Sequence, residues 1–166
     1  PDVGRLRYTG VMSKMLEEIR HQPAALEKTL RGGLREAARL RARFEKQRPR
    51  LIVLAARGTS DNACRFGRYL LEITTGIPVS LAAPSIYSLY DASVDLKDVL
   101  VVAISQSGES TDTNLVLERA RAAGAFTLGV TNEKASSMAR LAESMFYVRA
   151  GQGGPRHPRD CPRKRR

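Results

Sequence analysis

The sequence is poor in aromatic residues and in cysteine, and it contains no tryptophan. Aromatic side chains make up 5% of its 166 residues, so a core has to be built from leucine, isoleucine, valine and alanine. The longest fully apolar run covers residues 99–104, far short of the ~20 residues that cross a bilayer, and no signal peptide is visible. Cys64 and Cys161 lie far apart and form no CxxC pattern. We therefore expect a chain with no membrane contact that works in a reducing cytoplasm.

Acidic residues are outnumbered, and the excess of positive charge is unevenly distributed. The formal net charge is +11. Residues 151–166 hold six basic side chains against Asp160 alone, and much of the remaining excess lies in residues 31–50. That second segment carries apolar residues, among them Leu34 and Phe44, at a spacing that predicts an amphipathic helix with a solvated charged face. The basic balance alone establishes no nucleic-acid partner, and we expect none.

Five short apolar runs, rich in β-branched residues, follow residue 50. They lie at residues 51–55, 78–82, 99–104, 126–130 and 145–149. Such runs are typical of strands buried on both faces, and the segments between them are long enough for helices. Successive strand–helix–strand units with right-handed crossovers predict one parallel sheet. The expected fold class is α/β: a three-layer α/β/α sandwich around a five-stranded parallel sheet.

The first 50 residues predict helices instead of strands. Apolar residues between 12 and 30 recur at helical spacing, and Pro23 is expected to divide this segment into two helices. Gly32 and Gly33 predict a further break. We expect three parts: an N-terminal helical leader over residues 1–50, the sandwich over 51–150, and a basic tail rich in Gly, Pro and Arg over 151–166.

Polar side chains gather at two strand-to-helix junctions, where ligands bind in sheets of this kind. The first predicted strand is followed by Gly58, Thr59 and Ser60. The third is followed by three serines grouped around Gln106 and Gly108, namely Ser105, Ser107 and Ser110. Hydroxyls beside the unpaired N–H groups and the positive dipole end of a helix predict an anion site, and phosphate is its natural occupant.

Capping is the competing interpretation, because serine and threonine also close helix N-termini. A cap requires about one side chain, whereas the second junction has three hydroxyls on one turn, so the clustering favours a ligand. Neither junction has the GxGxxG or GxxxxGK[ST] pattern of nucleotide sites. The serine loop does not match a GxSxG nucleophile elbow, and the histidines, His21 and His157, lie in the leader and the tail. The sequence therefore argues against a serine hydrolase and against triphosphate hydrolysis.

The chain resembles the sugar-isomerase (SIS) family on three segments in the family's order. They are the leader phrase Met-Leu-Glu-Glu-Ile-Arg-His-Gln-Pro at residues 15–23, Gly-Thr-Ser after the first strand, and Ser-Gln-Ser-Gly-Glu-Ser-x-Asp-Thr after the third. The resemblance is to the isomerase half of glucosamine-6-phosphate synthase and its relatives, and it runs from about residue 12 to residue 150. It implies a flavodoxin-like SIS sandwich preceded by N-terminal helices.

The same resemblance implies a phosphosugar ligand such as fructose 6-phosphate or glucosamine 6-phosphate. Ser105, Ser107 and Ser110 would hold the phosphate, Gln106, Thr59 and Ser60 would lie near the sugar, and Gly58 and Gly108 would shape the two loops. It implies neither a cofactor nor a metal. Sites in this family are often completed across a subunit or domain interface, so we expect a homodimer that pairs through the apolar face of the leader.

Catalytic residues remain unassigned by this resemblance. Family members follow the fifth strand with a segment like Glu-x-x-Val-Ala-x-Thr-Lys, whereas here Ala150 is followed by the tail. We expect the tail to be disordered or non-native, as a frameshift would make it, with a basic arm that touches nucleic acid as the alternative. The chain as it stands is then expected to bind a phosphosugar without isomerising it.

Two function classes stay open at this level. One is a domain of an aldose–ketose isomerase or aminosugar-phosphate synthase, and the other is the phosphosugar-sensing domain of a transcriptional regulator. The leader phrase favours the enzyme class. Among neighbouring side chains, Glu109 suits a first-turn acid better than a catalytic base, and Cys64 suits a small core residue. Arg57 is expected to be a phosphate partner, a carboxylate partner or a plain surface residue.

Overall fold

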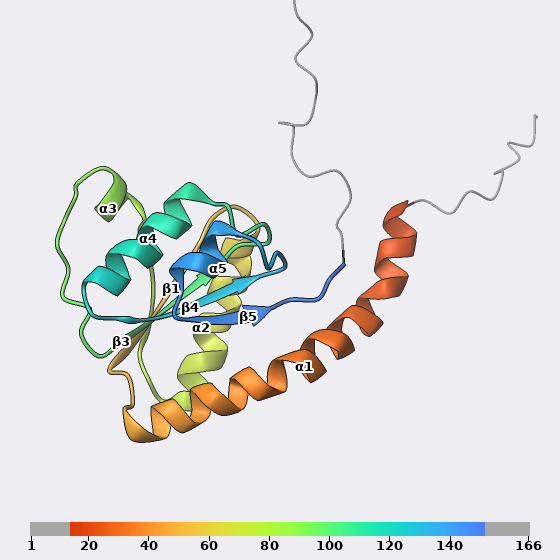
Figure 1. Cartoon of the computed structure of the whole chain (residues 1–166), viewed down its shortest axis with the longest axis horizontal. Helices are drawn as coiled ribbons and strands as arrows, with labels where there is room; N and C mark the ends of the chain where they lie inside the picture. Colours follow the sequence, from red (N-terminus) through yellow and green to blue (C-terminus); the bar gives the residue numbers. More distant parts are fainter. Residues whose placement is uncertain (1–13, 152–166) are drawn as a thin grey trace, which may run out of the picture.

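The computed structural model describes residues 14–151, in which helices and strands alternate along most of the chain (Figure 1). In chain order the elements are α1 (Lys14–Lys46), β1 (Leu51–Ala56), α2 (Ser60–Thr75), β2 (Val79–Leu81), α3 (Ser85–Ser88), β3 (Val99–Ile104), α4 (Thr111–Ala122), β4 (Phe126–Thr131), α5 (Ser137–Leu141) and β5 (Ser144–Tyr147). Apart from Gly151, the tail expected at residues 151–166 lies outside the described residues.

The five apolar runs form one parallel sheet, as predicted. Its strand order is β2-β1-β3-β4-β5, and every neighbouring pair is parallel. β1 and β3 are neighbours over their whole length, and their last residues, Ala56 and Ile104, lie opposite each other. The two polar junctions seen in the sequence therefore begin side by side at one edge of the sheet.

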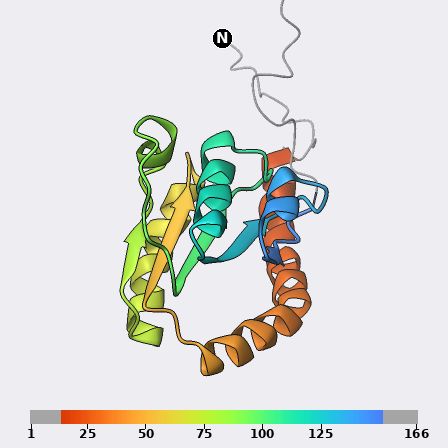
Figure 2. The ribbon, with the colours of Figure 1, turned by 60° about the vertical axis from the view of Figure 1, so that its left-hand side comes forward.

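Helices cover both faces of the sheet, which gives the expected three layers (Figure 2). Side chains of β3 alternate between two cores, because successive residues of a strand point to opposite faces. Val99, Val101 and Ala103 belong to the core beneath α4 and α5, whereas Leu100 and Val102 belong to the core beneath α2 and the end of α1. Burial on both faces explains why the strand runs contain almost no polar residue.

Helix α1 corrects the sequence prediction for the leader. It is one continuous helix with Pro23 inside it, and Gly32 and Gly33 do not break it. Strong helix formers on both sides of Pro23 outweigh the single backbone hydrogen bond that a proline removes. A Cβ on Gly33 would overlap the ring of Phe146 in β5. Gly33 therefore allows the helix to lie close against the edge strand, which is a packing role and not a break.

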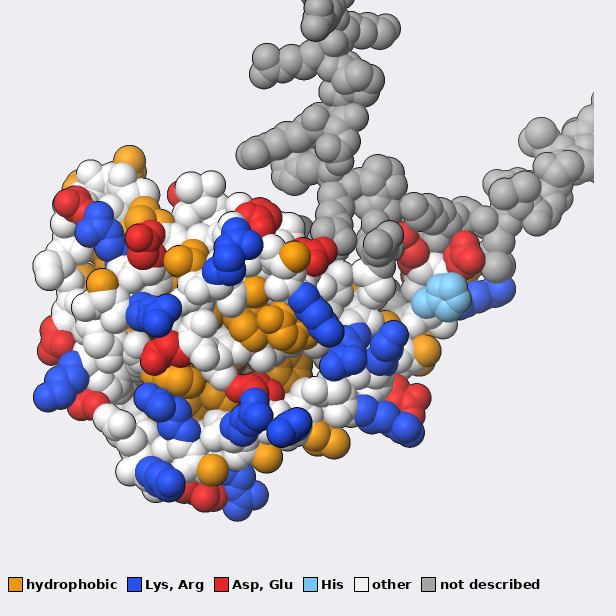
Figure 3. Space-filling model, viewed as in Figure 1, with side chains coloured by type: hydrophobic (Ala, Val, Ile, Leu, Met, Phe, Trp, Pro, Cys, Tyr) orange, Lys and Arg blue, Asp and Glu red, His pale blue; other side chains and the backbone are white. Residues whose placement is uncertain are grey.

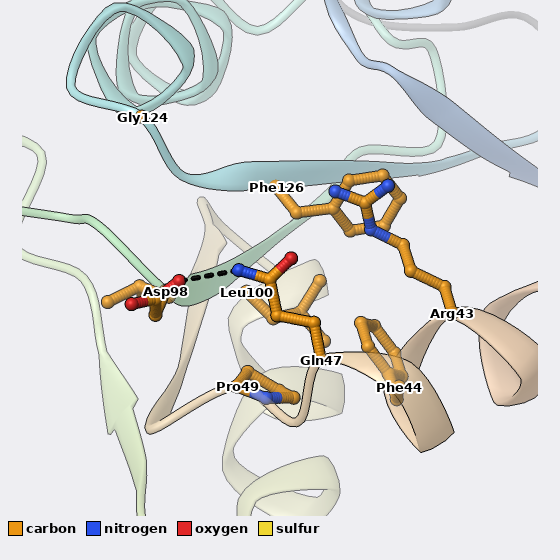
Figure 4. A pocket seen from close by; sticks show the side chains of 9 residues that line it. Arg43, Phe44, Gln47, Pro49, Asp98, Leu100, Gly124 and Phe126 are labelled. Atoms are coloured by element: carbon orange, nitrogen blue, oxygen red, sulfur yellow. Dashed lines mark hydrogen bonds between the residues drawn. The ribbon is translucent and has the colours of Figure 1, made fainter.

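The C-terminal end of α1 is fixed to the amino edge of the sheet (Figure 4). The ring of Phe44 contacts the ring of Phe126 edge-on, and the guanidinium of Arg43 lies 4.0 Å from the centre of the Phe126 ring. Just beyond the helix, the Gln47 amide donates a 2.7 Å hydrogen bond to the Asp98 carboxylate. These contacts line a small hollow at the opposite edge from the serine loop, and they have a structural role.

The other half of α1 extends past the sheet with its apolar residues uncovered (Figure 1). Four of them, Leu16, Ile19, Leu26 and Leu30, follow the spacing of one helix face and are 41–66% exposed. Among the described helices, α1 included, none is both long enough and apolar enough to cross a membrane.

Basic residues of α1 are mixed with acidic ones. Arg31 pairs with Glu27, Arg39 with Glu36 and Arg41 with Glu45, each one turn apart on the helix. Lys and Arg side chains are likewise interspersed with Asp and Glu on the face seen in Figure 3. This arrangement fits the solvated helix face that the sequence predicts.

Candidate functional site

The serine loop, residues 105–110, is held by hydrogen bonds between its own serines and its own backbone. The Ser105 hydroxyl, whose residue is 7% exposed, accepts a 3.1 Å hydrogen bond from the Gly108 N–H. The Ser107 hydroxyl accepts a 3.3 Å hydrogen bond from the Glu109 N–H. A hydroxyl that accepts in this way keeps its own hydrogen for donation. Both serines can therefore shape the loop and still donate to an anion.

Gly108 is the point at which the loop turns, and it requires a glycine for two reasons. Its φ of +66° lies in the left-handed region, and a Cβ there would overlap the side chain of Ser136. Its carbonyl accepts hydrogen bonds of 3.0 Å from the Asn114 side chain and from the Met138 N–H. The loop is thus braced from inside by α4 and α5.

Gln106 is fixed through its backbone, while its residue is exposed at the surface. Its carbonyl accepts hydrogen bonds of 3.1 Å from the Asn132 N–H and from the Thr131 hydroxyl. Sequence reasoning missed these bracing residues, as it missed Ser136. The available signal was a third polar segment, residues 131–137, directly after the fourth predicted strand.

The N-terminus of α4 is not closed by a side chain. Its N-cap residue, Ser110, makes no side-chain capping hydrogen bond, and its hydroxyl is paired with the Thr113 hydroxyl at 2.9 Å. The N-cap of α2, Thr59, also makes none. The short helix α5 differs, because the Ser136 hydroxyl accepts from the Ala139 N–H in the ordinary capping arrangement. The capping interpretation therefore holds for Ser136 and fails for Ser110 and Thr59.

The other junction presents its hydroxyls without internal partners. Gly58 has a φ of +62° and its carbonyl accepts from the Asp61 N–H, which forms the turn into α2. Thr59 is exposed and Ser60 is half-buried. Within residues 14–151 no hydrogen bond engages the Thr59 or the Ser60 hydroxyl. Both hydroxyls are therefore available to a bound molecule at this edge.

An ion pair joins the two junctions. Arg57, the first residue after β1, places its Nε 2.8 Å and an NH2 nitrogen 2.7 Å from the same Oδ2 oxygen of Asp112 in the first turn of α4. Of the three roles that the sequence left open for Arg57, the structure selects carboxylate partner. The two junctions are thus linked by this ion pair as well as by the pairing of β1 with β3.

Two further candidates from the sequence are not placed as reacting groups. The Glu109 carboxylate accepts a 2.8 Å hydrogen bond from the Ser137 N–H. Hydrogen bonding with the side chain of Ser137, and then with its backbone, lowers the pKa of Glu109. A carboxylate with a lowered pKa is a weak base at neutral pH. The Cys64 thiol is buried, and burial raises its pKa to about 11, so it is a core residue as expected.

Three hollows of the described part of the chain lie away from the serine loop. One lies at the amino edge of the sheet, one lies along α1 where Arg149 packs against it, and one lies between α1 and β5. No residue of the serine loop lines any of these three. Within residues 14–151 no group of three or more His, Cys, Asp and Glu side chains is arranged to hold a metal ion. The serine loop remains the candidate site, and it lies outside these three hollows.

Comparison with known proteins identifies the family of the chain. The model of the SIS domain matches residues 46–153. The chain belongs to the SIS-domain family. It is 39% identical over 155 residues to the glutamine–fructose-6-phosphate aminotransferase (isomerizing) of Symbiobacterium thermophilum, and 39% identical over 140 residues to that of Thermus thermophilus. These alignments cover 89% and 82% of this SIS chain but only 25% and 23% of the two relatives, so it spans about a quarter of their length.

Solved structures extend the comparison to the fold. The C-terminal domain of glucosamine-fructose-6-phosphate aminotransferase from Francisella tularensis matches this SIS domain with a TM-score of 0.73 and 30% identity, over 86% of this chain and 41% of that one. The sugar isomerase domain of an RpiR transcription factor from Sphaerobacter thermophilus matches with a TM-score of 0.64 and 20% identity, over 82% and 76% of the two chains. The second likeness concerns the fold alone.

Proposed function

We propose that this SIS domain binds a hexose or hexosamine 6-phosphate, of the fructose 6-phosphate or glucosamine 6-phosphate class, at the serine loop. The single observation that carries the proposal is the N-terminus of α4, which has a hydroxyl-rich loop in front of it and no side-chain cap. Unpaired N–H groups and the positive end of the helix dipole attract a dianion, and serine hydroxyls add donors. Ser105, Ser107 and Ser110 contact the phosphate, while Gln106, Thr59 and Ser60 contact the sugar.

The domain belongs, in this proposal, to a protein of the isomerase or aminosugar-phosphate synthase type, and residues 14–151 bind without catalysing. Moving a proton between adjacent sugar carbons requires a free base beside the sugar. At the described edge the Glu109 carboxylate is bound to the Ser137 N–H and the Asp112 carboxylate is paired with Arg57. Neither is free to act as that base. The cytoplasmic location expected from the cysteine content stays a prediction.

Calorimetric titration of the chain with fructose 6-phosphate, glucosamine 6-phosphate, fructose and glucosamine tests the proposal. Hydrogen bonds to a charged group each contribute about 1.5–3 kcal/mol, so the phosphates are expected to bind on the order of a hundredfold or more tightly than the free sugars. Equal affinity for a sugar and its phosphate would refute the phosphate site.

Association of two chains is the second part of the proposal. The uncovered residues of α1, Leu16, Ile19, Leu26 and Leu30, form an apolar face of the kind that marks an interface. We expect a homodimer in light scattering. We expect replacement of Leu26 and Leu30 by serine to give folded monomers whose melting temperature, unlike that of the wild type, does not depend on protein concentration. A wild-type chain that stays monomeric at high concentration would contradict this part.

A further inference from the structure

The Arg57–Asp112 ion pair connects the two junctions of the proposed phosphosugar site. The two side chains come from positions 55 residues apart in sequence, and both guanidinium contacts go to one carboxylate oxygen at 2.8 and 2.7 Å. The Arg57 side chain is 61% exposed and that of Asp112 is 35% exposed. An ion pair exposed to this degree adds little to folding stability, so folding alone does not account for it.

Asp112 poses an electrostatic problem for anion binding. It lies in the first turn of α4, where a negative charge stabilises the helix dipole. The same turn supplies the N–H groups to which a phosphate dianion would bind, and an unpaired carboxylate there would repel that dianion. The guanidinium of Arg57 offsets this charge through its contacts of 2.8 and 2.7 Å with the Asp112 carboxylate. The positive charge is thus directed at Asp112 and not at the serine hydroxyls.

We propose that Arg57 is a positioning residue for phosphate affinity, acting by neutralising Asp112 and not by touching the ligand. This inference rests on the proposed function, because it concerns the affinity of the same site. In this role of the pair, the Asp112 charge lowers the affinity for an anion only when Arg57 is absent.

Four variants of the 166-residue chain separate this role from the alternatives. They are Arg57→Met, Asp112→Asn, the double variant, and Arg119→Met as the matched control. Arg119 also pairs with an aspartate from another segment, Asp91 at 2.6 Å, but it lies in the last turn of α4. Each variant is titrated by calorimetry with inorganic phosphate and with fructose 6-phosphate, at low and at high sodium chloride, and its thermal unfolding is followed by circular dichroism.

We expect Arg57→Met to weaken the binding of both probes on the order of tenfold at low salt, because the unpaired Asp112 carboxylate then repels the anion. The loss of affinity should shrink at high salt, which screens this repulsion. The double variant restores the wild-type affinity, and Asp112→Asn alone binds at least as tightly as wild type. Arg119→Met leaves the affinity unchanged. Rescue by Asp112→Asn is the result that a structural role would not produce, since that change cannot rebuild the lost pair.

Three results would overturn the inference. A double variant as weak as Arg57→Met would make Arg57 a direct ligand of the phosphate, and an Asp112→Asn variant as weak as Arg57→Met would make the pair a mechanical tie. Unchanged affinity in Arg57→Met would mean that Arg57 is a surface residue with no role in anion binding. If the wild-type chain bound neither probe, the proposed function itself would fail, which is distinguishable from all three.

Discussion

The helices α4 and α5 both have a serine at the N-cap position, but only the serine of α5 caps its helix with its side chain. Ser136 is fully buried and caps α5 by accepting from the Ala139 N–H. Ser110 is half-buried at the edge of the sheet and leaves the first turn of α4 without a side-chain acceptor. The Ser136 hydroxyl thus satisfies its own helix, whereas the N-terminus of α4 keeps N–H groups that no side chain caps and that could bind an anion.

The two helix starts are also mechanically connected. Ser136 packs against Gly108, and the Met138 N–H donates to the Gly108 carbonyl. The capped N-terminus of α5 therefore packs against the serine loop and supports it at Gly108.

The largest effect is expected from Gly108→Ala. The new methyl group is forced into a left-handed backbone conformation and overlaps Ser136, so the free energy of unfolding should fall by about 3 kcal/mol or more. Gly124→Ala is the control, because Gly124 has a φ of +83° and no atom within 4 Å of an added Cβ. The Gly124→Ala variant should lose only about 1–2 kcal/mol of the free energy of unfolding. Equal losses in urea unfolding would show that the contact with Ser136 is unimportant.

Ser107→Ala and Ser110→Ala should act on binding and not on stability. Each removes a donor to a charged group, so each is expected to weaken fructose 6-phosphate binding by about 1.5–3 kcal/mol in calorimetry. Their melting temperatures should fall by only a few degrees, since neither hydroxyl caps α4 and each variant loses one hydrogen bond, to the Glu109 N–H or to the Thr113 hydroxyl. A variant that melts earlier and binds normally would return these serines to the capping interpretation.

Ser136→Ala should show the reverse pattern. Loss of an N-cap acceptor costs about 1 kcal/mol of stability, while the donors of the serine loop remain in place. Thermal unfolding followed by circular dichroism measures the first quantity and calorimetry with fructose 6-phosphate the second. Reduced affinity without any reduced stability would mean that Ser136 belongs to the ligand site.

The smallest effect concerns Glu109 and pH. The hydrogen bond from Ser137 lowers the pKa of Glu109, so its ionised form stabilises the fold above the ordinary carboxyl pKa. That contribution is lost as the pH falls through the lowered pKa. Glu109→Gln should therefore melt slightly earlier than wild type at neutral pH and at the same temperature in acid. A difference in melting temperature that persists in acid would mean that Glu109 stabilises the fold by packing and not by its charge.

The sequence predicted the strands well because the signal for them is local. Runs such as residues 99–104 are apolar at every position, and only a strand buried on both faces requires that pattern. The helix breaks in the leader were wrong because their cause is not local. Gly33 is a glycine on account of Phe146, more than 100 residues away, and no spacing within the leader reports that contact.

The sequence predicted where the candidate site lies in the fold, but it did not predict the hydrogen bonds that its residues make. Three serines at one junction indicated an anion, and β1–β3 pairing brought the second junction beside it. Whether Ser110 caps its helix depends on where its hydroxyl points, and the roles of Arg57 and Ser136 depend on contacts made by the folded chain. Those features follow from the tertiary structure and have no signature in residue spacing.

An amide NMR titration of the chain with fructose 6-phosphate, with fructose as the control, tests the phosphate site most directly. We expect the N–H signals of the serine loop and of the first turn of α4 to shift with the phosphate and not with fructose. The N–H signals of α5, whose N-terminus is already capped, should shift far less. Shifts confined to α5 or to the hollow at the amino edge of the sheet, or equal shifts with fructose, would rule out a phosphate site at the serine loop.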